Sequence, residues 1–242
     1  RDRLRSRGLG DVYKRQGEVL TGWLQTGNNW YWLDPANDGA MSRGIVSVGS
    51  SRYYLSDSGA MAVGWAFDGT DWYYADGSGA LASGWRSVNG AWYWLDIAND
   101  NRMVTGFFSI GSNRYHFSST GALSLGWFMS DGDWYYAEPS NASGIVKTGW
   151  LKDGSQYYYL DPAVDGKMLL GHFSVNGKSY YAKGSGAVAC REWVDVQDSV
   201  QDGPSKAFAG SDCSLCGTLR NGKLFTSNGD GELVEARGFV TL

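Results

Sequence analysis

A short motif recurs eight times between Gly22 and Ala189, and this repetition constrains the fold more than any other feature. Each copy runs Gly, a bulky residue, a polar turn, an aromatic triplet, a second Gly-containing turn and commonly Ala-Met or Ala-Leu. The copies follow one another at intervals of 20 to 23 residues and begin at Gly22, Gly44, Gly64, Gly84, Gly106, Gly126, Gly149 and Gly171. A repeat this short cannot bury its own apolar face, so neighbouring copies must stack to form a core. We therefore expect an all-β solenoid of hairpin repeats.

The third copy illustrates the hairpin. Residues 64–67 are expected to form a short strand, residues 68–71 a turn and residues 72–75 the return strand, because aromatic runs bounded by Asp-Gly favour strand and turn. No window shows a helical period, and the chain holds 35 glycines, which weaken helices. Almost no helix is expected.

A second period groups the copies in threes. The first, fourth and seventh share a longer second turn, at residues 33–39, 95–101 and 160–166. The second, fifth and eighth lack the Trp after the first Gly and open their triplets with Arg52, Arg114 and Ser179. If each hairpin turns about a third of the way round a superhelix, each class of copy lines its own face.

This pattern resembles the choline-binding or cell-wall-binding repeats of bacterial surface proteins, whose unit reads Gly-Trp, a turn, Trp-Tyr-Tyr, a polar turn, Gly, any residue and Met. Glucan-binding repeats of glucosyltransferases and the repeats of large clostridial toxins look similar. The resemblance covers residues 21–189. It implies a choline-binding-like superhelix with a ligand cage between consecutive units, made of two aromatics from one unit and one from the next, often with Met or Leu alongside.

The physical reason for such a cage is independent of the family. A quaternary ammonium cannot donate a hydrogen bond, and each aromatic face attracts it by about 0.5 to 2 kcal/mol. The candidate cages are Trp23 and Trp30 with Tyr54, Trp65 and Trp72 with Trp94, Trp127 and Trp134 with Tyr159, and Trp85 and Trp92 with His116. A charged His116 would repel a cation. At the remaining junctions Ile45, Phe107 and His172 replace Trp, and a stacked Arg52 or Arg114 would fill the place of a cation.

The middle residue of every triplet is Tyr and points away from its neighbours, because strand side chains alternate. These eight tyrosines are expected to form a core ladder, which leaves the outer two triplet positions for ligand. They are Tyr31, Tyr53, Tyr73, Tyr93, Tyr115, Tyr135, Tyr158 and Tyr180.

Nothing in the sequence indicates catalysis, a cofactor or a metal site. The only histidines, His116 and His172, occupy repeat positions where other copies carry aromatics, and the recurrent Asp residues are expected to cap backbone N–H groups in turns. The turns that hold Asp34 and Asp96 lack the closing Glu of a calcium loop. Beyond residue 16 acidic side chains outnumber basic ones, which disfavours nucleic acid and anionic polymers as partners.

The two ends depart from the repeat. Residues 1–16 are Arg-rich, resemble translated adapter sequence and are expected to be a disordered, non-native arm, with a genuine basic arm as the alternative. Residues 17–189 are expected to form the repeat domain, and residues 190–242 are expected to be an irregular tail with a degenerate repeat near residues 217–242. Cys190 can pair with Cys213 or Cys216 in an extracellular setting, which leaves one thiol over.

These observations predict a non-catalytic module on the bacterial cell surface that anchors a larger protein to a wall polymer, with choline-bearing teichoic acid as the first ligand and no membrane insertion. Several weak cages on one chain gain avidity on a polymer. Three alternatives stay open. They are a glucan- or glycan-binding module, the targeting part of a peptidoglycan hydrolase, and a stalk without ligand.

Overall fold

The computed structural model describes residues 14–15, 18–196, 205–220, 223–227 and 233–235. Within these ranges the chain is built from antiparallel strands, and the helical content is confined to the short 3-10 turns η2 (Pro35–Asn37), η3 (Ile97–Asn99), η4 (Ser140–Ala142) and η5 (Pro162–Val164). The expectation of an all-β chain with almost no helix is confirmed. No helix in the described part is long and apolar enough to cross a membrane.

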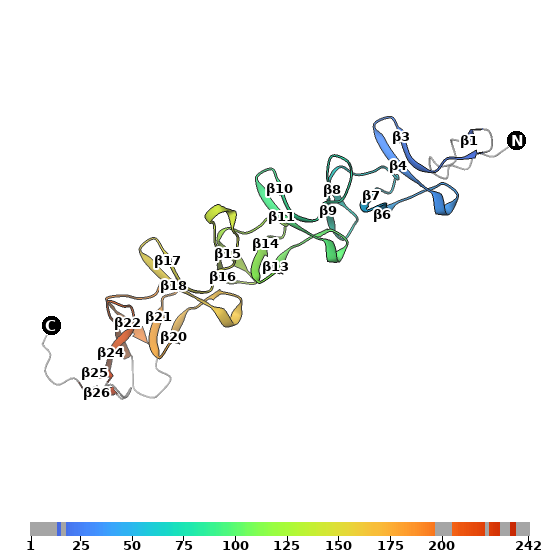
Figure 1. The fold of residues 1–242 in the computed structure, drawn as a ribbon. Coiled ribbons are helices and arrows are strands. Elements are labelled where there is room, and N and C mark those ends of the chain that lie inside the picture. The colour runs from blue at the N-terminus through green and yellow to red at the C-terminus, as the bar shows by residue number, and fades with distance from the viewer. Residues whose placement is uncertain (1–13, 16–17, 197–204, 221–222, 228–232, 236–242) are drawn as a thin grey trace. The chain divides into compact units, whose positions relative to one another are not determined.

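Eight two-stranded hairpins follow one another along the chain (Figure 1). Each opens at one of the eight predicted glycines, and in every case that glycine has a φ between 70° and 89°, which explains why Gly recurs there. The hairpins are β3 (Gly22–Thr26) with β4 (Asn29–Asp34), β6 (Gly44–Val48) with β7 (Ser51–Leu55), β8 (Gly64–Phe67) with β9 (Trp72–Ala75), β10 (Gly84–Val88) with β11 (Ala91–Asp96), β13 (Gly106–Ile110) with β14 (Asn113–Phe117), β15 (Gly126–Ser130) with β16 (Asp133–Ala137), β17 (Gly149–Asp153) with β18 (Gln156–Asp161), and β20 (Gly171–Val175) with β21 (Lys178–Ala182).

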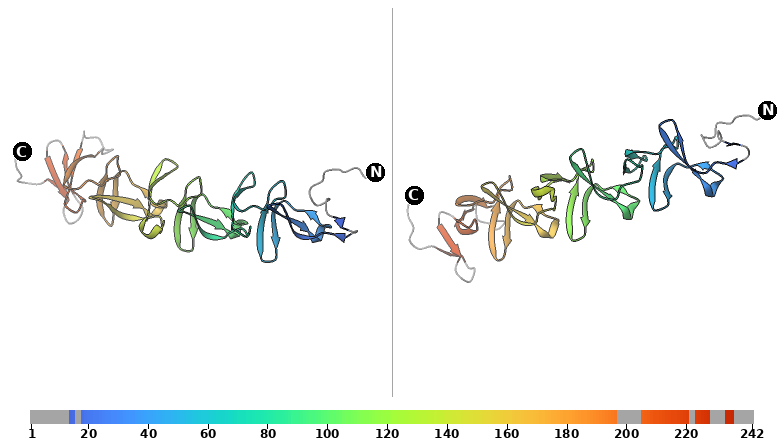
Figure 2. Two further views of the ribbon diagram at one scale, coloured as in Figure 1. Left: turned by 90° about the horizontal axis from the view of Figure 1, so that it is seen from above. Right: turned by 45° about the horizontal axis from the view of Figure 1, so that its top comes forward.

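A third, very short segment completes each unit by pairing with the end of the return strand. In the long-turn units it is a strand, β5 (Ala40–Met41), β12 (Arg102–Met103) or β19 (Lys167–Met168). In the other units it is a single bridge, as between Leu55 and Met61 or between Phe117 and Leu123. Two further views show the same alternation of hairpin and turn (Figure 2).

The most deeply buried position is the residue that follows each aromatic triplet, two places beyond the middle Tyr and therefore on the same face of the strand. Its exposed fraction is 2 % or less in every unit, at Leu33, Leu55, Ala75, Leu95, Phe117, Ala137, Leu160 and Ala182. Tyr31, Tyr73, Tyr115, Tyr135 and Tyr180 are buried beside it. Tyr53, Tyr93 and Tyr158 are only half-buried, so the predicted core ladder holds for five of the eight tyrosines.

The long second turns are held by their first Asp, as the sequence predicts. Asp34 accepts a hydrogen bond from the backbone N–H of Ala36 at 2.9 Å, and Asp161 accepts the equivalent bond from Ala163 at 2.9 Å. Asp96 does the same for Ala98 at 3.1 Å. Each carboxylate thereby caps a 3-10 turn whose first N–H groups have no helical partner.

The chain divides into two compact parts, and the division falls within the β13–β14 hairpin. Each part contains an ion pair that joins units two apart, Arg52 to Asp100 at 2.8 Å in the first part and Arg114 to Asp165 at 3.0 Å in the second. The same kind of ion pair thus recurs three units further along the chain, in step with the three-unit period of the sequence. The ion pairs also give these two arginines an anionic partner, in place of the ring stacking considered from sequence. The solenoid arrangement of all eight units stays a prediction.

The C-terminal segment differs from the expected irregular tail. Five strands form an antiparallel meander in chain order, β22 (Glu192–Val196), β23 (Ser205–Ala209), β24 (Leu215–Arg220), β25 (Lys223–Ser227) and β26 (Leu233–Glu235). A disulfide joins Cys190 to Cys213, which decides between the two pairings considered. Ala189, which ends the repeats, forms a small buried cluster with Val194 and Ala209 of this sheet.

The predicted N-terminal arm lies almost wholly outside the described residues. Only its last part is described, as β1 (Lys14–Arg15), which pairs with β2 (Glu18–Val19). Asn221 and Gly222, within the repeat expected near residues 217–242, also lie outside, although Arg220 pairs with Lys223 on either side of them. The domain boundaries at residues 16 and 189 stay predictions.

Candidate aromatic cages

The first Trp of the triplet is exposed in every unit that carries one. Trp72 exposes 44 % of its surface and Trp134 exposes 42 %, and Trp30 and Trp92 are similar. Large aromatic side chains bury most of their surface in ordinary cores, so a recurrent exposed Trp is a candidate for ligand binding. The Trp after the opening Gly packs edge to face against this exposed Trp, with ring centroids 6.4 Å apart for Trp65 and Trp72. The pairs Trp23–Trp30 and Trp85–Trp92 have the same geometry, at 6.5 and 6.3 Å.

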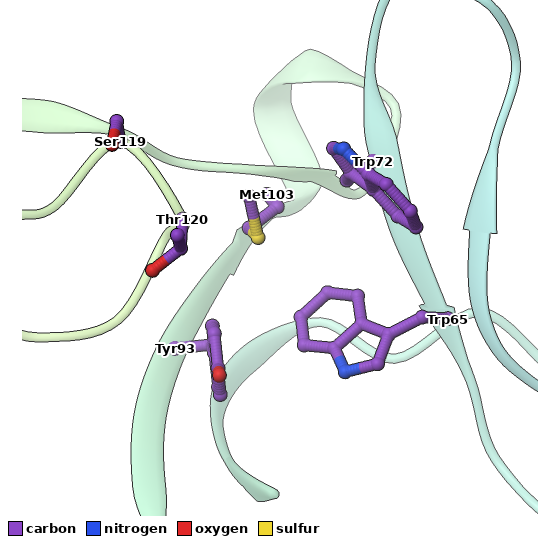
Figure 3. A pocket seen from close by; sticks show the side chains of 6 residues that line it. All are labelled: Trp65, Trp72, Tyr93, Met103, Ser119 and Thr120. Atoms are coloured by element: carbon purple, nitrogen blue, oxygen red, sulfur yellow. The ribbon is translucent and has the colours of Figure 1, made fainter.

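The first of two equivalent cavities opens between Trp65 and Trp72 of the third unit and Tyr93 and Met103 of the fourth (Figure 3). We call this set the Trp65 cage. Its volume is about 370 Å³, within the range of small-molecule sites. The Trp65 and Tyr93 rings meet at 4.7 Å, and the polar turn of the fifth unit, at Ser119 and Thr120, lines the far side.

The second cavity repeats this arrangement in the other part of the chain. It is lined by Trp127 and Trp134 of the sixth unit, Tyr158 and Met168 of the seventh, and residues 184 and 185 of the eighth. We call the two Trp, the Tyr and the Met the Trp127 cage. Its volume is about 330 Å³, and the Trp127 and Tyr158 rings meet at 4.8 Å. Both cages therefore occur where a Trp-Tyr-Tyr unit precedes a long-turn unit.

The third ring of each cage differs from the one expected. Tyr93 and Tyr158, assigned to the core from sequence, line the cavities, whereas Trp94 and Tyr159 do not line them. Trp94 lies directly across the strands from Trp85 and packs against it at 5.4 Å within its own hairpin. Tyr159 packs in the same way on Trp150 at 5.2 Å. The middle Tyr of a triplet thus lies on the strand face that meets Trp65 or Trp127 of the preceding hairpin, and the third residue of the triplet lies on the opposite face.

The first candidate cage follows the same rule. Trp23 meets Tyr53 of the second unit at 4.7 Å, with the ring arrangement of the Trp65 cage. The predicted third ring, Tyr54, instead stacks on Tyr73 at 5.9 Å and donates a hydrogen bond to the Phe67 carbonyl at 3.2 Å. Trp23, Trp30 and Tyr53 therefore form a ring set like that of the Trp65 cage.

His116, the ring expected beside Trp85 and Trp92, is buried in the second part. It stacks on Phe128 at 4.4 Å, and its Nδ1 lies 2.8 Å from the Ser124 hydroxyl. Burial lowers the pKa of His116, so the ring is neutral at pH 7 and the expected repulsion of a cation does not arise. Trp85 packs on Trp94 and, at 5.8 Å, on Phe117.

The methionines of the cages are held by glycines of the following unit. Met103 packs against Gly121, and Met168 packs against Gly186, so closely that a Cβ at either glycine would overlap the thioether. The polar turn residues that line each cavity directly precede these glycines. Three consecutive units thus build one cage. The family pattern indicated a Met or Leu nearby, but not which one.

In each cage an ion-paired carboxylate directly precedes the exposed Trp. Asp71, which precedes Trp72, pairs with Arg102 at 3.2 Å, and Asp133, which precedes Trp134, pairs with Lys167 at 2.8 Å. Asp68 accepts hydrogen bonds from Thr70 N–H, Asp71 N–H and the Tyr73 hydroxyl. The backbone hydrogen bond from Asp71 is the main cause that lowers the pKa of Asp68, so this carboxylate is anionic at neutral pH.

This arrangement suits recognition of a cation without hydrogen-bond donors. Three aromatic rings and a polarizable thioether surround an open space, and none of them can act as an acid, base or nucleophile at pH 7. In the described part of the chain, no three His, Cys, Asp or Glu side chains gather as a metal site would require. The absence of catalysis and of a calcium site stays a prediction.

Known proteins place these repeats in a family. The putative cell wall binding repeat family matches residues 21–41, 63–81, 83–96, 105–123, 126–140 and 148–163, which include both Trp pairs of the two cages. The chain contains repeats of the cell-wall-binding family. The resemblance inferred from sequence is confirmed. Among curated proteins, none matches the sequence.

Solved structures of choline-binding proteins share this fold. Choline binding protein F from Streptococcus pneumoniae, crystallised in the presence of a peptidoglycan analogue, is 32% identical over 77% of this chain and 61% of its own, with a TM-score of 0.62. The present chain thus spans about three fifths of that protein. The choline-binding domain of CbpL from the same organism is 26% identical over 81% of this chain and 97% of its own, with a TM-score of 0.53.

A third relative, the modular autolysin LytC from S. pneumoniae, shares the fold alone. It is 24% identical over 88% of this chain and 48% of its own, with a TM-score of 0.54. This hairpin fold thus occurs both in an autolysin and in choline-binding proteins.

Proposed function

We propose that this module anchors a larger protein at the bacterial cell surface by holding the choline groups of teichoic acid in the cages between its hairpins. The observation that carries the proposal is the recurrence of one lining, Trp, Trp, Tyr and Met, in two cavities of similar volume. The names of the relatives support it, since several are choline-binding proteins.

Charge favours choline over an anionic ligand. The carboxylate beside each exposed Trp is paired with a cation, so the negative surroundings come from the chain as a whole, which carries a net charge of −4. A quaternary ammonium gains from both the ring faces and the negative surroundings. Two or more cages on one chain then bind a choline-bearing polymer with more avidity than a single choline.

A fluorescence titration of the full chain with choline tests the proposal. We expect a saturable change in Trp emission, and we expect Trp72→Ala and Trp134→Ala each to weaken binding at its own cage by about 2- to 30-fold, the contribution of one ring. Trp72→Phe and Trp134→Phe keep a ring and should retain part of the affinity. Val164→Ala, an exposed apolar residue outside both linings, should change nothing.

The result distinguishes the open alternatives. A change with neutral glucan oligosaccharides and none with choline would assign the exposed Trp faces to sugar rings. No saturable change with either ligand would overturn the binding proposal and favour a stalk.

A further inference from the structure

The two cages match in ring geometry. In the Trp65 cage, Trp65 meets Tyr74 at 5.1 Å and 75° and Tyr93 at 4.7 Å and 67°. In the Trp127 cage, Trp127 meets Tyr136 at 5.2 Å and 76° and Tyr158 at 4.8 Å and 65°. Any difference in cation affinity must therefore come from what surrounds the rings.

A carboxylate touches the Trp127 cage directly. The indole Nε1 of Trp127 donates a hydrogen bond to Asp153 at 2.8 Å, and the charge of Asp153 contributes, after burial, to the raised pKa of Tyr136. Asp153 is the last residue of β17, and the last residue of the equivalent strand β10 is Val88. The Trp65 cage therefore has an apolar residue at this position.

A guanidinium lies behind the Trp65 cage. Arg86 lies over the ring of Tyr74 at 5.3 Å and stands directly across the strands from Tyr93, so it adjoins two of the rings that form or support the cage. Its Nε is buried without a hydrogen-bond partner among the described residues. The equivalent residue opposite Tyr158 is Leu151, which is buried.

Other charged groups near the two cages change this electrostatic difference only in part. The charge of Asp76 interacts with that of Arg86, but the Asp76 carboxylate already accepts two hydrogen bonds from Ser78. Lys152 follows Leu151 on the opposite face of the strand and lies over Tyr157 at 5.6 Å. The ion pairs beside the exposed Trp residues are equivalent in the two cages.

We propose that the Trp127 cage is the tight site for a quaternary ammonium and the Trp65 cage the weak one, and that Asp153 and Arg86 set this difference. The inference rests on the proposed function. A hydrogen bond from the indole to a carboxylate makes the ring face more negative, whereas a neighbouring guanidinium opposes a second cation. At these separations the two effects together correspond to an affinity ratio of about fivefold or more.

The two cages can be measured separately in one sample by ¹⁹F NMR of the full chain labelled with 5-fluorotryptophan. The Trp72 and Trp134 signals, assigned with Trp72→Phe and Trp134→Phe, report the two cages during a choline titration. We expect the Trp134 signal to reach its midpoint at about a fifth of the choline concentration that the Trp72 signal needs.

Each test variant installs the residue that the other cage already carries. Asp153→Val should weaken the Trp127 cage, Arg86→Leu should tighten the Trp65 cage, and the double variant should bring the two midpoints together. Asp153→Asn keeps a hydrogen-bond acceptor and removes only the charge of an exposed side chain, so it tests the proposal even where Arg86→Leu does not fold. The neutral choline analogue 3,3-dimethyl-1-butanol should show no such discrimination between the cages.

The failures are distinguishable. Absence of any choline-dependent shift at both signals would overturn the proposed function itself. Saturable shifts with equal midpoints would leave that function intact and overturn the present inference. A difference that survives the double variant, or that the neutral analogue reproduces, would remove Asp153 and Arg86 as its cause.

Discussion

Contacts between methionine and glycine show why single residues in this repeat are so restricted. The thioether of Met103 fills the space where a Cβ of Gly121 would lie, and the backbone of Gly121 has a φ of 79°. Gly121 is therefore required twice, once for its backbone and once for its lack of a side chain. Met41, Met61 and Met168 meet Gly59, Gly79 and Gly186 in the same way.

Replacing Gly121 tests this double requirement. Gly121→Ala should destabilise the chain by about 1 to 2 kcal/mol through backbone strain and by a further 1 to 3 kcal/mol through overpacking against Met103. Gly49→Ala is the matched control, because Gly49 has a φ of 62° but open space where a Cβ would lie. Thermal unfolding measures both, and equal losses in the two variants would contradict a packing role for Gly121.

Tyr73 provides a prediction on pH. Burial, together with the hydrogen bond to Asp68, raises the pKa of Tyr73 to about 12 from an ordinary value near 10. Because the folded pKa is the higher one, this contribution to stability is complete below pH 10 and is lost as the pH rises towards 12. Tyr73→Phe should cost about 1 kcal/mol at pH 8. In urea unfolding, the difference between wild type and variant should shrink above pH 10, and a constant difference would exclude this titration.

At the scale of elements, the long second turns position the cages. In the fourth unit Asp96 caps η3, and Asn101 donates a hydrogen bond to the Ala82 carbonyl at 2.9 Å before the chain enters β12 and Met103. Asp96 and Asn101 are among the few buried polar residues of the described chain. The turn therefore fixes where the thioether of the Trp65 cage lies.

Loss of this cap should be costly, whereas loss of an exposed ion pair should not. Asp96→Ala removes the bond to the Ala98 N–H and should destabilise the chain by about 1 kcal/mol, with weaker choline binding at the Trp65 cage. Arg52→Gln removes the exposed pair with Asp100 and should cost between about 0 and 1 kcal/mol. Chemical denaturation of the two variants side by side gives the comparison, which fails if Arg52→Gln costs more.

At the scale of the whole molecule, we expect stability to be local. Within each compact part neighbouring repeats are joined by hydrogen bonds, as when the N–H of Met61 bonds the Trp30 carbonyl or that of Val188 bonds the Tyr157 carbonyl. In such chains stability is a sum of units and of the interfaces between neighbours. The disulfide between Cys190 and Cys213 joins the last repeat to the C-terminal sheet, where Lys178 also pairs with Asp212 at 2.9 Å.

Reduction of this disulfide should therefore act locally. We expect residues of β22, β23 and β24 to lose hydrogen-exchange protection by an amount that corresponds to about 3 kcal/mol, whereas β3 to β11 keep theirs. Cys216→Ser should leave both the disulfide and the protection unchanged, because Cys216 is not its partner. Loss of protection across all hairpins on reduction would show that the chain unfolds as one unit.

The sequence by itself determined the hairpins, their eight starting glycines, the Asp-capped turns and the repeat family. These features depend on neighbours along the chain, namely turn chemistry, strand alternation and a fixed period, and such local rules can be read without coordinates. The Trp pair of each cage was predictable for the same reason, because Trp65 and Trp72 belong to one hairpin.

Only the tertiary structure decided which residues complete the cages. Alternation assigns Tyr93 and Trp94 to opposite faces of a strand, but it does not say which face meets the preceding hairpin. Contact with Trp65 assigns that role to Tyr93. The pairing of Cys190 and the C-terminal sheet depend in the same way on contacts between segments far apart in sequence, which no local pattern records.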